Sequence, residues 1–287
     1  MSDIPRLNGV IGALENGGHA FTSFAPISIQ AATAMAGSNF DGIVFEGEHN
    51  PWDILGLSHS LQFMLNPRQI AAAGSVAPPV TPLCRVPVNG VEQGQWHAKQ
   101  ALDQGVYGIV WPHISTVEEA YNAVAACRYP RLKDKPLYEP QGIRGDGPGK
   151  ACRYWGLSQQ EYYTKADVWP LASDGEILVV LQIEDTAGIG NLDDMLKNVP
   201  GIGAILIGEG DLGQELGFPR QYDHPALLEA MAEIVAICKA NDVIVGHPHA
   251  NAGNMQRLLD EGYRFIMPGS TTDYAGLEKG LELTNRT

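Results

Sequence analysis

The chain of 287 residues is predicted to form a (β/α)8 barrel, as a single domain over residues 1–287. Two observations favour this fold. Short apolar runs alternate with helical patterns along the whole sequence, and eight such strand–helix units follow one another. Several of the runs are continuously apolar, as expected for parallel strands that are buried on both faces. The first unit carries no glycine-rich phosphate loop, which an open doubly wound sheet usually has.

Each predicted strand is a short run of mostly apolar residues. In chain order they are Ala20–Phe24, Gly42–Phe45, Pro82–Val86, Gly108–Trp111, Ile177–Ile183, Ala204–Ile207, Val243–Val245 and Phe265–Met267. Runs of this length match the usual length of strands and are too short for buried helices. Their even distribution along the chain is typical of repeated strand–helix units.

Helical patterns lie between the strands. The clearest are Thr116–Cys127, Pro225–Ala240 and Asn254–Glu261. Thr116 stands three residues before Glu119, which is the signature of a capping box at a helix start. Gly105 and Gly262 stand just past predicted helices, where a glycine often ends a helix in the left-handed conformation.

The charge balance restricts the partners. With 19 basic and 33 acidic residues the formal net charge is −14, and no cluster of Lys and Arg offsets it. Such a surface repels phosphate backbones, so we expect neither nucleic acid nor an anionic membrane as partner. No apolar run approaches the roughly 18 to 20 residues of a membrane span, and the first residues lack a signal-peptide pattern. We therefore expect a cytoplasmic protein that acts on small molecules.

Polar and ionisable residues follow almost every predicted strand. In a barrel these positions gather at one mouth, where barrel enzymes carry their chemistry. The residues of interest at these positions are Glu46, His49, Arg85, His113, Gln182, Glu184, Asp211, His247 and His249. Scattered surface residues would not show this order.

Glu184 and Asp211 follow neighbouring strands, so their carboxylates can converge on a divalent cation that prefers oxygen ligands. The alternative is that Asp211 caps the next helix while Glu184 pairs with a cationic side chain. Arg85 can bind a substrate carboxylate, or it can pair with a structural acid. His49 can act as a general base near neutral pH, or it can be a solvated loop residue.

Five sequence motifs in this order carry a resemblance to a known family. They are FDGIVFEGEHNPWD (Phe40–Asp53), PLCRVP (Pro82–Pro87), ALDQGVYGIVWPHISTVEEA (Ala101–Ala120), GIRGDGPGKACRYWG (Gly142–Gly156), and VLQIEDTAGIGNLDDML (Val180–Leu196), which continues into GIGAILIGEGDLGQELG (Gly201–Gly217). The chain resembles the HpcH/HpaI family of metal-dependent, class II pyruvate aldolases, of which macrophomate synthase is an unusual relative. The similarity runs from about Phe40 to Thr272.

The resemblance implies an assembly and a cofactor. It implies a barrel whose last helix is exchanged between protomers, assembled as a homo-hexamer made of three dimers. It also implies that Glu184 and Asp211 bind a divalent metal ion such as Mg²⁺, Mn²⁺ or Co²⁺. The 2-keto oxygen and the carboxylate of the substrate would complete the coordination.

The resemblance also assigns roles to single residues. Arg85 would contact the keto oxygen, and His49 would act as the base. Gln182 would line the metal site. The backbone N–H groups of Gly210 and Asp211 would bind the pyruvyl carboxylate, and the loop from Gly145 to Pro148 would lie nearby. Asp103 would reach the site of the adjacent protomer.

The chain departs from the family pattern at several positions. Glu46 stands where relatives have the Asp that orients the catalytic histidine, so the dyad can shift or Glu46 can take another role. Glu209 replaces a proline. His113, His247 and His249 are histidines where small or apolar residues are common, so they are candidates for contact with the aldehyde portion of the substrate, with structural hydrogen bonding as the alternative.

The expected activity is that of an aldehyde-lyase. A 4-hydroxy-2-oxo acid would be cleaved reversibly to pyruvate and an aldehyde through a pyruvate enolate, whose charge a cation and an arginine can stabilise. Two alternatives stay open. One is decarboxylation of oxaloacetate, or decarboxylative carbon–carbon bond formation, on the same metal site. The other is a non-catalytic barrel that binds a small acid.

Overall fold

Nine parallel strands form the sheet of the protein. The structure is a computed structural model that describes residues 4–88, 90–269 and 272–286. The strands are β1 (Ala20–Pro26), β2 (Gly42–Glu46), β3 (Thr81–Arg85), β4 (Gly108–Trp111), β5 (Val168–Trp169), β6 (Ile177–Ile183), β7 (Ala204–Ile207), β8 (Ile244–Ala250) and β9 (Phe265–Pro268). Almost all of their residues are buried, as their apolar sequences predict.

Eight of these strands close into a barrel. The sheet order is β4-β3-β2-β1-β9-β8-β7-β6-β5, and β4 also pairs with β6, so that the sheet meets itself. The short β5 pairs only with the beginning of β6. Every pairing is parallel, and Glu46 at the end of β2 lies beside Arg85 at the end of β3. The predicted (β/α)8 barrel is therefore confirmed.

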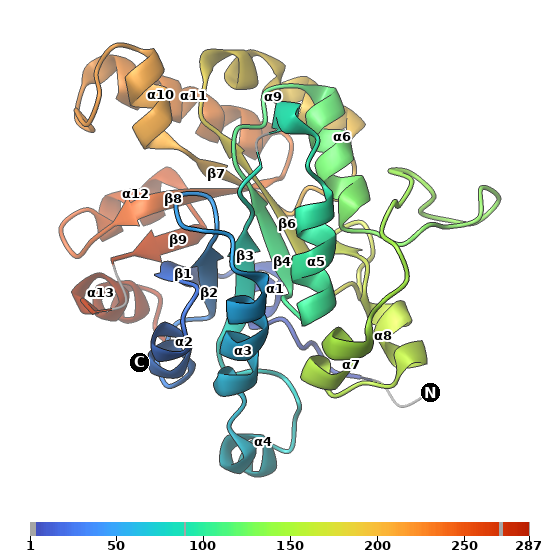
Figure 1. Cartoon of the computed structure of the whole chain (residues 1–287). Helices are drawn as coiled ribbons and strands as arrows, with labels where there is room; N and C mark the ends of the chain where they lie inside the picture. The colour runs from blue at the N-terminus through green and yellow to red at the C-terminus, as the bar shows by residue number, and fades with distance from the viewer. Residues whose placement is uncertain (1–3, 89, 270–271, 287) are drawn as a thin grey trace.

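Helices cover the outside of the barrel (Figure 1). The α-helices of the described residues are α1 (Gly9–Glu15), α2 (Ile29–Ala36), α3 (Ile54–Met64), α4 (Pro67–Ala73), α5 (Trp96–Gln104), α6 (Val117–Ala126), α7 (Gly149–Trp155), α8 (Gln159–Lys165), α9 (Thr186–Asn198), α10 (Glu209–Glu215), α11 (Pro225–Ala240), α12 (Met255–Glu261) and α13 (Ala275–Leu283). No helix in the described part of the chain is long and apolar enough to span a membrane.

The predicted helix boundaries follow from local chemistry. The side chain of Thr116 accepts a hydrogen bond from the backbone N–H of Glu119, and the Glu119 carboxylate accepts one from Thr116, which confirms the capping box at the start of α6. Gly105 and Gly262 end α5 and α12 at φ values of 117° and 96°. Side chains rarely adopt this left-handed conformation, and a glycine does so without steric cost.

Two strands differ most from the prediction, while β1, β2, β3 and β9 differ from it by one or two residues at their ends. β5 has only two residues, too few to produce a recognisable pattern in the sequence. β8 continues through Gly246, His247, Pro248 and His249 to Ala250, whereas the prediction ended it at Val245. A proline and two histidines read as a loop, but the strand is irregular here, with a register shift between His247 and Ala250 against β9.

The last helix packs on its own barrel. A Cβ atom added to Gly280 of α13 would lie 2.6 Å from the ring of Phe21 in β1, so the helix lies directly on this strand. Another close approach joins Gly276 to Pro268 of β9. The structure does not show an exchange of α13 between protomers, which stays a prediction.

Candidate active site at the barrel mouth

Three side chains converge just beyond the carboxyl ends of the strands. Glu48 follows β2, His113 follows β4, and Glu184 follows β6. One ligand-type atom from each lies within 4.8 Å of the other two. The Nε2 atom of His113 is 3.6 Å from the Glu48 carboxylate, and its Nδ1 atom is 3.5 Å from the Glu184 carboxylate. These residues form what we call the Glu48–His113–Glu184 cluster.

The backbone of His113 is held in an uncommon conformation. Its φ is 50°, in the left-handed region that non-glycine residues seldom occupy, although histidine does so more often than most. In this conformation its N–H donates a hydrogen bond of 2.7 Å to the Glu184 carboxylate. The conformation therefore brings both the backbone donor and the imidazole of His113 to the same acidic group.

Arg85 lies beside the cluster and contacts several side chains of the mouth. Its Nε atom donates to Glu46 over 2.8 Å, and its Nη2 atom contacts the same carboxylate. Its Nη1 atom lies 2.9 Å from Glu48 and 3.3 Å from the side-chain oxygen of Gln182. The guanidinium also lies over the ring of Phe24, 4.3 Å from the ring centroid. These four neighbours of Arg85 hold its guanidinium group in a fixed position beside the cluster.

Gln182 and Gly208 position Glu184. The Gln182 amide donates to the Glu184 carboxylate over 2.8 Å, so one side chain connects Arg85 with Glu184. Gly208, at the end of β7, leaves the space that the carboxylate occupies, since an added Cβ would lie 2.0 Å from a Glu184 oxygen. Only a glycine fits at this point of contact.

Burial changes the acidity of both carboxyl groups of the cluster. Removal from water raises the pKa of Glu184 to about 7, and the negative charges of Glu48 and Asp211 add to this shift. The pKa of Glu48 is also raised by burial, with the charge of Glu46 adding a smaller contribution and Arg85 opposing it. Two buried carboxyl groups this close to each other are difficult to ionise at the same time, because their negative charges repel. A cation between them would reduce this repulsion.

The cluster has the properties of a site for a divalent metal ion. It offers two carboxylates and one imidazole, and the buried Oε2 atom of Glu48 lies 2.9 Å from Arg85 but makes no well-aligned hydrogen bond with a described residue. The side chains of Glu48 and Glu184 are 9% and 2% exposed. Buried carboxylates and an imidazole suit Mn²⁺, Co²⁺ and similar ions. The residues therefore fit the expected cofactor class.

His49 and Glu46 do not form the dyad that the resemblance implies. The Glu46 carboxylate binds Arg85 and accepts the backbone N–H groups of Glu48 and His49 over 2.7 and 3.1 Å. The imidazole of His49 is 66% exposed, and its Nε2 atom lies 3.7 Å from Glu48. The longer side chain of glutamate reaches the arginine, so Glu48 replaces Glu46 as the acid beside His49.

Asp211 lies in the first turn of α10, two residues after Glu209 begins the helix. It is exposed and is not one of the three residues whose ligand atoms lie within 4.8 Å. Its charge still raises the pKa of Glu184, so the two carboxylates are within electrostatic reach. Gly210 precedes it, partly exposed, with open space around its Cα.

A second polar cluster, Glu209–His247–His249, lies behind this turn. The buried Glu209 carboxylate is 2.5 Å from the Nδ1 atom of His249 and 3.5 Å from the Nε2 atom of His247. The backbone N–H of His249 donates to Nδ1 of His247. Burial lowers the pKa of His247 to about 4, so its ring is neutral. Each histidine thus makes one ring hydrogen bond within the protein, while the His249 ring stays 54% exposed.

Asp103 and the 145–148 loop form a separate region. Asp103, in α5, accepts a hydrogen bond of 3.0 Å from Arg144, and burial raises the pKa of its carboxyl group. Gly145 is exposed and Pro148 is buried at the start of α7. No hydrogen bond or ion pair between described residues connects this region with the Glu48–His113–Glu184 cluster, and the predicted reach of Asp103 to another protomer stays a prediction.

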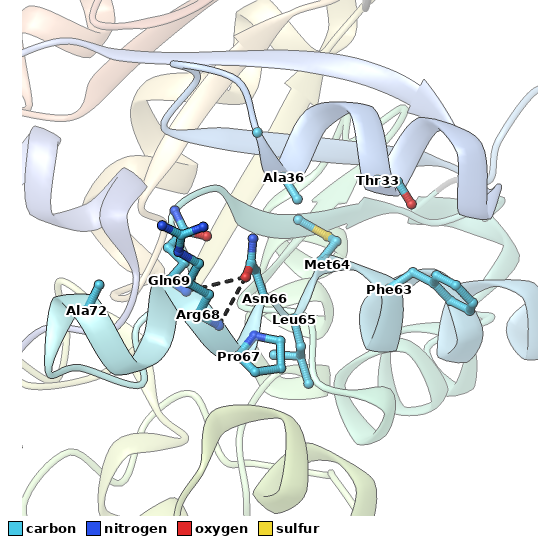
Figure 2. A pocket seen from close by; sticks show the side chains of 11 residues that line it. Thr33, Ala36, Phe63, Met64, Leu65, Asn66, Pro67, Arg68, Gln69 and Ala72 are labelled. Atoms are coloured by element: carbon cyan, nitrogen blue, oxygen red, sulfur yellow. Dashed lines mark hydrogen bonds between the residues drawn. The ribbon is translucent and has the colours of Figure 1, made fainter.

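A cavity also lies beside the ends of α2 and α3 and the start of α4 (Figure 2). Its volume is about 540 Å³, and Phe63, Met64, Asn66 and Arg68 are among its lining residues. Asn66 caps α4 through hydrogen bonds from the backbone of Arg68 and Gln69. This cavity has no carboxylate or histidine in its lining, so it does not compete with the mouth as a site of acid–base or metal chemistry.

Comparison with known proteins agrees with this geometry. Residues 23–275 match the sequence profile of HpcH/HpaI aldolase/citrate lyase. The chain belongs to this family. The HpcH/HpaI match includes the strand ends that carry Glu48, Arg85, His113 and Glu184. The family membership that the five motifs predicted is therefore confirmed.

Curated HpcH/HpaI relatives cover most of the chain. A 5-keto-4-deoxy-D-glucarate aldolase of Escherichia fergusonii is 32% identical over 85% of this chain and 82% of its own length. A 4-hydroxy-2-oxovalerate aldolase of Rhodococcus jostii is 33% identical over 84% of this chain and 81% of its own. The prediction of an aldehyde-lyase is confirmed by these relatives.

Solved structures of HpcH/HpaI proteins share the fold. A family member from Burkholderia cenocepacia superimposes with a TM-score of 0.73 and 25% identity, covering 97% of this chain and 98% of that one. Macrophomate synthase has a TM-score of 0.68 and 23% identity, over 99% of this chain and 90% of its own. Macrophomate synthase thus supports the barrel fold and no more.

Glu48 is the residue of the cluster that the sequence pattern did not single out. It stands in the run Glu46-Gly47-Glu48-His49, where either glutamate could be the acid that lies beside His49. Its signal was present, because it follows β2 as the other site residues follow their strands. The choice between the acids depends on the loop after Glu46, which the sequence pattern alone does not determine.

Proposed function

We propose that the protein is a metal-dependent class II aldolase. It cleaves a 4-hydroxy-2-oxo acid to pyruvate and an aldehyde, and it catalyses the reverse addition. The observation that carries the proposal is the placement of Arg85 beside two buried carboxylates at the barrel mouth, 2.9 Å from Glu48 and linked to Glu184 through Gln182. This arrangement offers positive charge and ligand groups around one point, as formation of a pyruvate enolate requires.

Glu184 and Glu48 are the proposed carboxylate ligands of the cation, with Asp211 as the ligand that the family resemblance adds. A bound divalent ion such as Mg²⁺, Mn²⁺ or Co²⁺ would act as a Lewis acid for the enolate charge. Gln182 holds the Glu184 carboxylate in place through its 2.8 Å hydrogen bond. The backbone N–H groups of Gly210 and Asp211 would bind the pyruvyl carboxylate.

Arg85 is the residue that stabilises the developing charge. Its guanidinium would donate to the keto oxygen of the substrate while Glu46 keeps its plane fixed. His49 is the proposed base that takes the proton of the 4-hydroxyl group, with its Nε2 atom 3.7 Å from Glu48. Its exposed ring faces solvent, so the proton can leave the site.

The relatives support a small 2-oxo acid and an aldehyde as reactants. Besides the two aldolases above, a hydroxypyruvate/pyruvate aldolase of Agrobacterium fabrum is 32% identical over 88% of this chain and 84% of its own length. The exposed ring of His249 and the partly exposed ring of His113 are the proposed contacts for the aldehyde portion, with His247 behind them. Gly145 and Pro148 would lie near the pyruvyl carboxylate.

The assembly and location are also proposed. We propose a homo-hexamer of three dimers in which α13 is exchanged and Asp103 reaches the neighbouring site. We propose that the enzyme works in the cytoplasm as a single barrel domain. The net charge of −14 supports a small-molecule enzyme that binds neither nucleic acid nor an anionic membrane.

The first experiment measures enolate formation without any aldehyde. The protein is incubated with pyruvate in D₂O with Mg²⁺, Mn²⁺ or Co²⁺, and again with EDTA, while NMR follows the methyl protons. We expect metal-dependent loss of the methyl signal. If no metal ion produces exchange, pyruvate is not the nucleophile and the aldolase proposal fails, and release of CO₂ from oxaloacetate should then be measured.

A further inference from the structure

The position of His113 relative to the two carboxylates calls for an explanation. Its ring nitrogens lie 3.6 Å from Glu48 and 3.5 Å from Glu184, beyond the 2.7 to 3.2 Å of ordinary N–H···O hydrogen bonds. Two ligand atoms that each stand about 2.1 Å from a metal ion are roughly 3.0 to 3.4 Å apart. One ring nitrogen of His113 lies within 4.8 Å of an oxygen of each carboxylate, and Nε2 is 3.6 Å from Glu48. A small approach of the side chains would therefore let a single ion contact all three.

We propose that His113 supplies a nitrogen ligand to the catalytic cation, together with Glu48 and Glu184. This inference rests on the proposed metal-dependent aldolase, and it adds a ligand that the predicted pair of Glu184 and Asp211 lacks. A mixed site of two carboxylates and one imidazole binds Co²⁺, Ni²⁺ and Zn²⁺ more strongly than a site of oxygen ligands alone, while Mg²⁺ gains little from a nitrogen ligand. His113 therefore sets the metal preference of the enzyme.

Glu48 supplies an independent observation. Its side chain is 9% exposed, and its Oε2 atom is buried without a hydrogen-bond donor in the described part of the chain. Arg85 is 2.9 Å from this oxygen but does not satisfy it with a well-aligned hydrogen bond. A carboxylate oxygen can accept two partners, so beside its ion pair with Arg85 this oxygen can also bind an ion.

The local backbone directs the His113 ring toward the two carboxylates. The residue keeps a φ of 50°, and its N–H is bonded to the carboxylate that its ring faces. Glu184 thereby holds the histidine by its backbone and leaves the ring nitrogens free. The ring is 32% exposed, so it borders the open side of the site where an ion and substrate enter.

The test compares His113→Asn with the unmodified enzyme. Asparagine tolerates the left-handed conformation and removes the imidazole. Isothermal titration calorimetry with Co²⁺ and with Mg²⁺ gives the affinities without substrate. We expect the Co²⁺ affinity to fall at least tenfold and the Mg²⁺ affinity to fall less than about threefold. Pulsed EPR of the Mn²⁺-loaded enzyme should show coupling to a histidine nitrogen, and the variant should lose it.

The matched control is His59→Asn, which removes an exposed histidine from α3 and should leave both affinities and the nitrogen coupling unchanged. Equal loss of Co²⁺ and Mg²⁺ affinity in His113→Asn, or absence of nitrogen coupling in the unmodified enzyme, overturns the proposal. Coupling that persists in His113→Asn and disappears in His49→Asn assigns the ligand to His49 instead. These measurements need no pyruvate, so their failure is distinct from absent methyl exchange.

Discussion

Arg85 makes contacts that no other cation can reproduce. Its Nε and Nη2 atoms bind one carboxylate as a fork while Nη1 faces Glu48 and Gln182. Lysine keeps the charge but cannot make this planar set of contacts. We expect Arg85→Lys to slow metal-dependent methyl exchange of pyruvate by about 10²-fold or more, because removal of a charge-stabilising donor costs about this much. NMR in D₂O measures the rate.

Arg153→Lys is the control for this change, because Arg153 is exposed on α7 and the substitution is chemically the same. Its exchange rate should match that of the unmodified enzyme. Thermal unfolding of both variants checks that the barrel is intact. Exchange in Arg85→Lys within about threefold of the original would remove Arg85 from the role of charge stabiliser.

Substituting Glu48 and Asp211 one at a time shows which of the two carboxylates binds the metal ion. Glu48→Gln should lower the Mn²⁺ affinity strongly, because the side chain is buried in the cluster and loses its charge. We expect Asp211→Asn to lower it by at least tenfold if the exposed aspartate completes the coordination. Calorimetric titration gives both constants. Unchanged affinity in Asp211→Asn would leave Glu48, His113 and Glu184 as the protein's ligand set.

The acidity of Glu184 predicts a dependence of stability on pH. Its pKa rises from an ordinary value of 4.5 to about 7 in the folded protein, so folding favours the protonated form. The contribution is fully present below pH 4.5 and is lost as the pH rises through 7. With EDTA present, we expect the free energy of unfolding to fall by roughly 1 to 3 kcal/mol over this range. Urea unfolding measures it.

Glu184→Gln provides the comparison, because the amide does not ionise and keeps a similar shape. Its unfolding free energy should change less between pH 4.5 and 7, with the remaining slope due to Glu48, whose pKa is raised as well. A slope identical to that of the unmodified protein would show that Glu184 does not titrate in this range.

The turn between β7 and α10 joins the two polar clusters of the mouth. Gly208 packs against the Glu184 carboxylate on one side, and the next residue, Glu209, binds His249 and lies 3.5 Å from His247 on the other. A methyl group at Gly208 would displace Glu184, because the added carbon would be 2.0 Å from its oxygen. We expect Gly208→Ala to lower Mn²⁺ affinity at least tenfold, as judged by calorimetry.

Gly190→Ala in α9 is the matched control, since an added Cβ there meets no atom within 4 Å. Alanine at an open helix position favours folding by about 0.5 to 1 kcal/mol, so this variant should keep its metal affinity and gain a little stability. If both glycine variants bind Mn²⁺ equally, the contact between Gly208 and Glu184 does not control the site.

The strands were predictable to different degrees. Buried parallel strands such as Ile177–Ile183 form long apolar runs, and the prediction of this one was correct at both ends. β8 was cut short because His247, Pro248 and His249 lack an apolar pattern, although their backbones continue the strand. Hydrophobic periodicity reports burial, so it does not detect a strand whose side chains serve a polar cluster.

The site was predictable where a side chain lies at the end of a strand or directly after it. Arg85, Gln182 and Glu184 lie together at the mouth, as their positions in the sequence indicated. The partners of Glu46 and the approach of His113 to Glu184 depend on loop conformations, including a positive φ at a residue other than glycine. Such conformations are fixed by tertiary contacts, and residue type alone does not indicate them.

Closure of the barrel is what brings these groups to one place. Glu48, His113 and Glu184 are far apart in the sequence and follow three different strands, yet the parallel sheet directs all three strand ends to the same mouth. Asp103 does not share in this convergence, because it projects from α5 and pairs with Arg144. The resemblance predicts that Asp103 acts at the site of a second protomer.

This prediction can be tested by mixing subunits. Asp103→Ala and Arg85→Lys subunits should each form inactive assemblies, whereas dissociation and joint reassembly should restore activity, since one site can then combine Arg85 of one subunit with Asp103 of its neighbour. Random assortment of equal amounts predicts about a quarter of the original activity for a symmetric assembly. Aldol cleavage is the readout, and sedimentation velocity confirms the predicted hexamer. No recovery in a mixed assembly would mean that Asp103 serves its own barrel, where its bond to Arg144 positions the 145–148 loop.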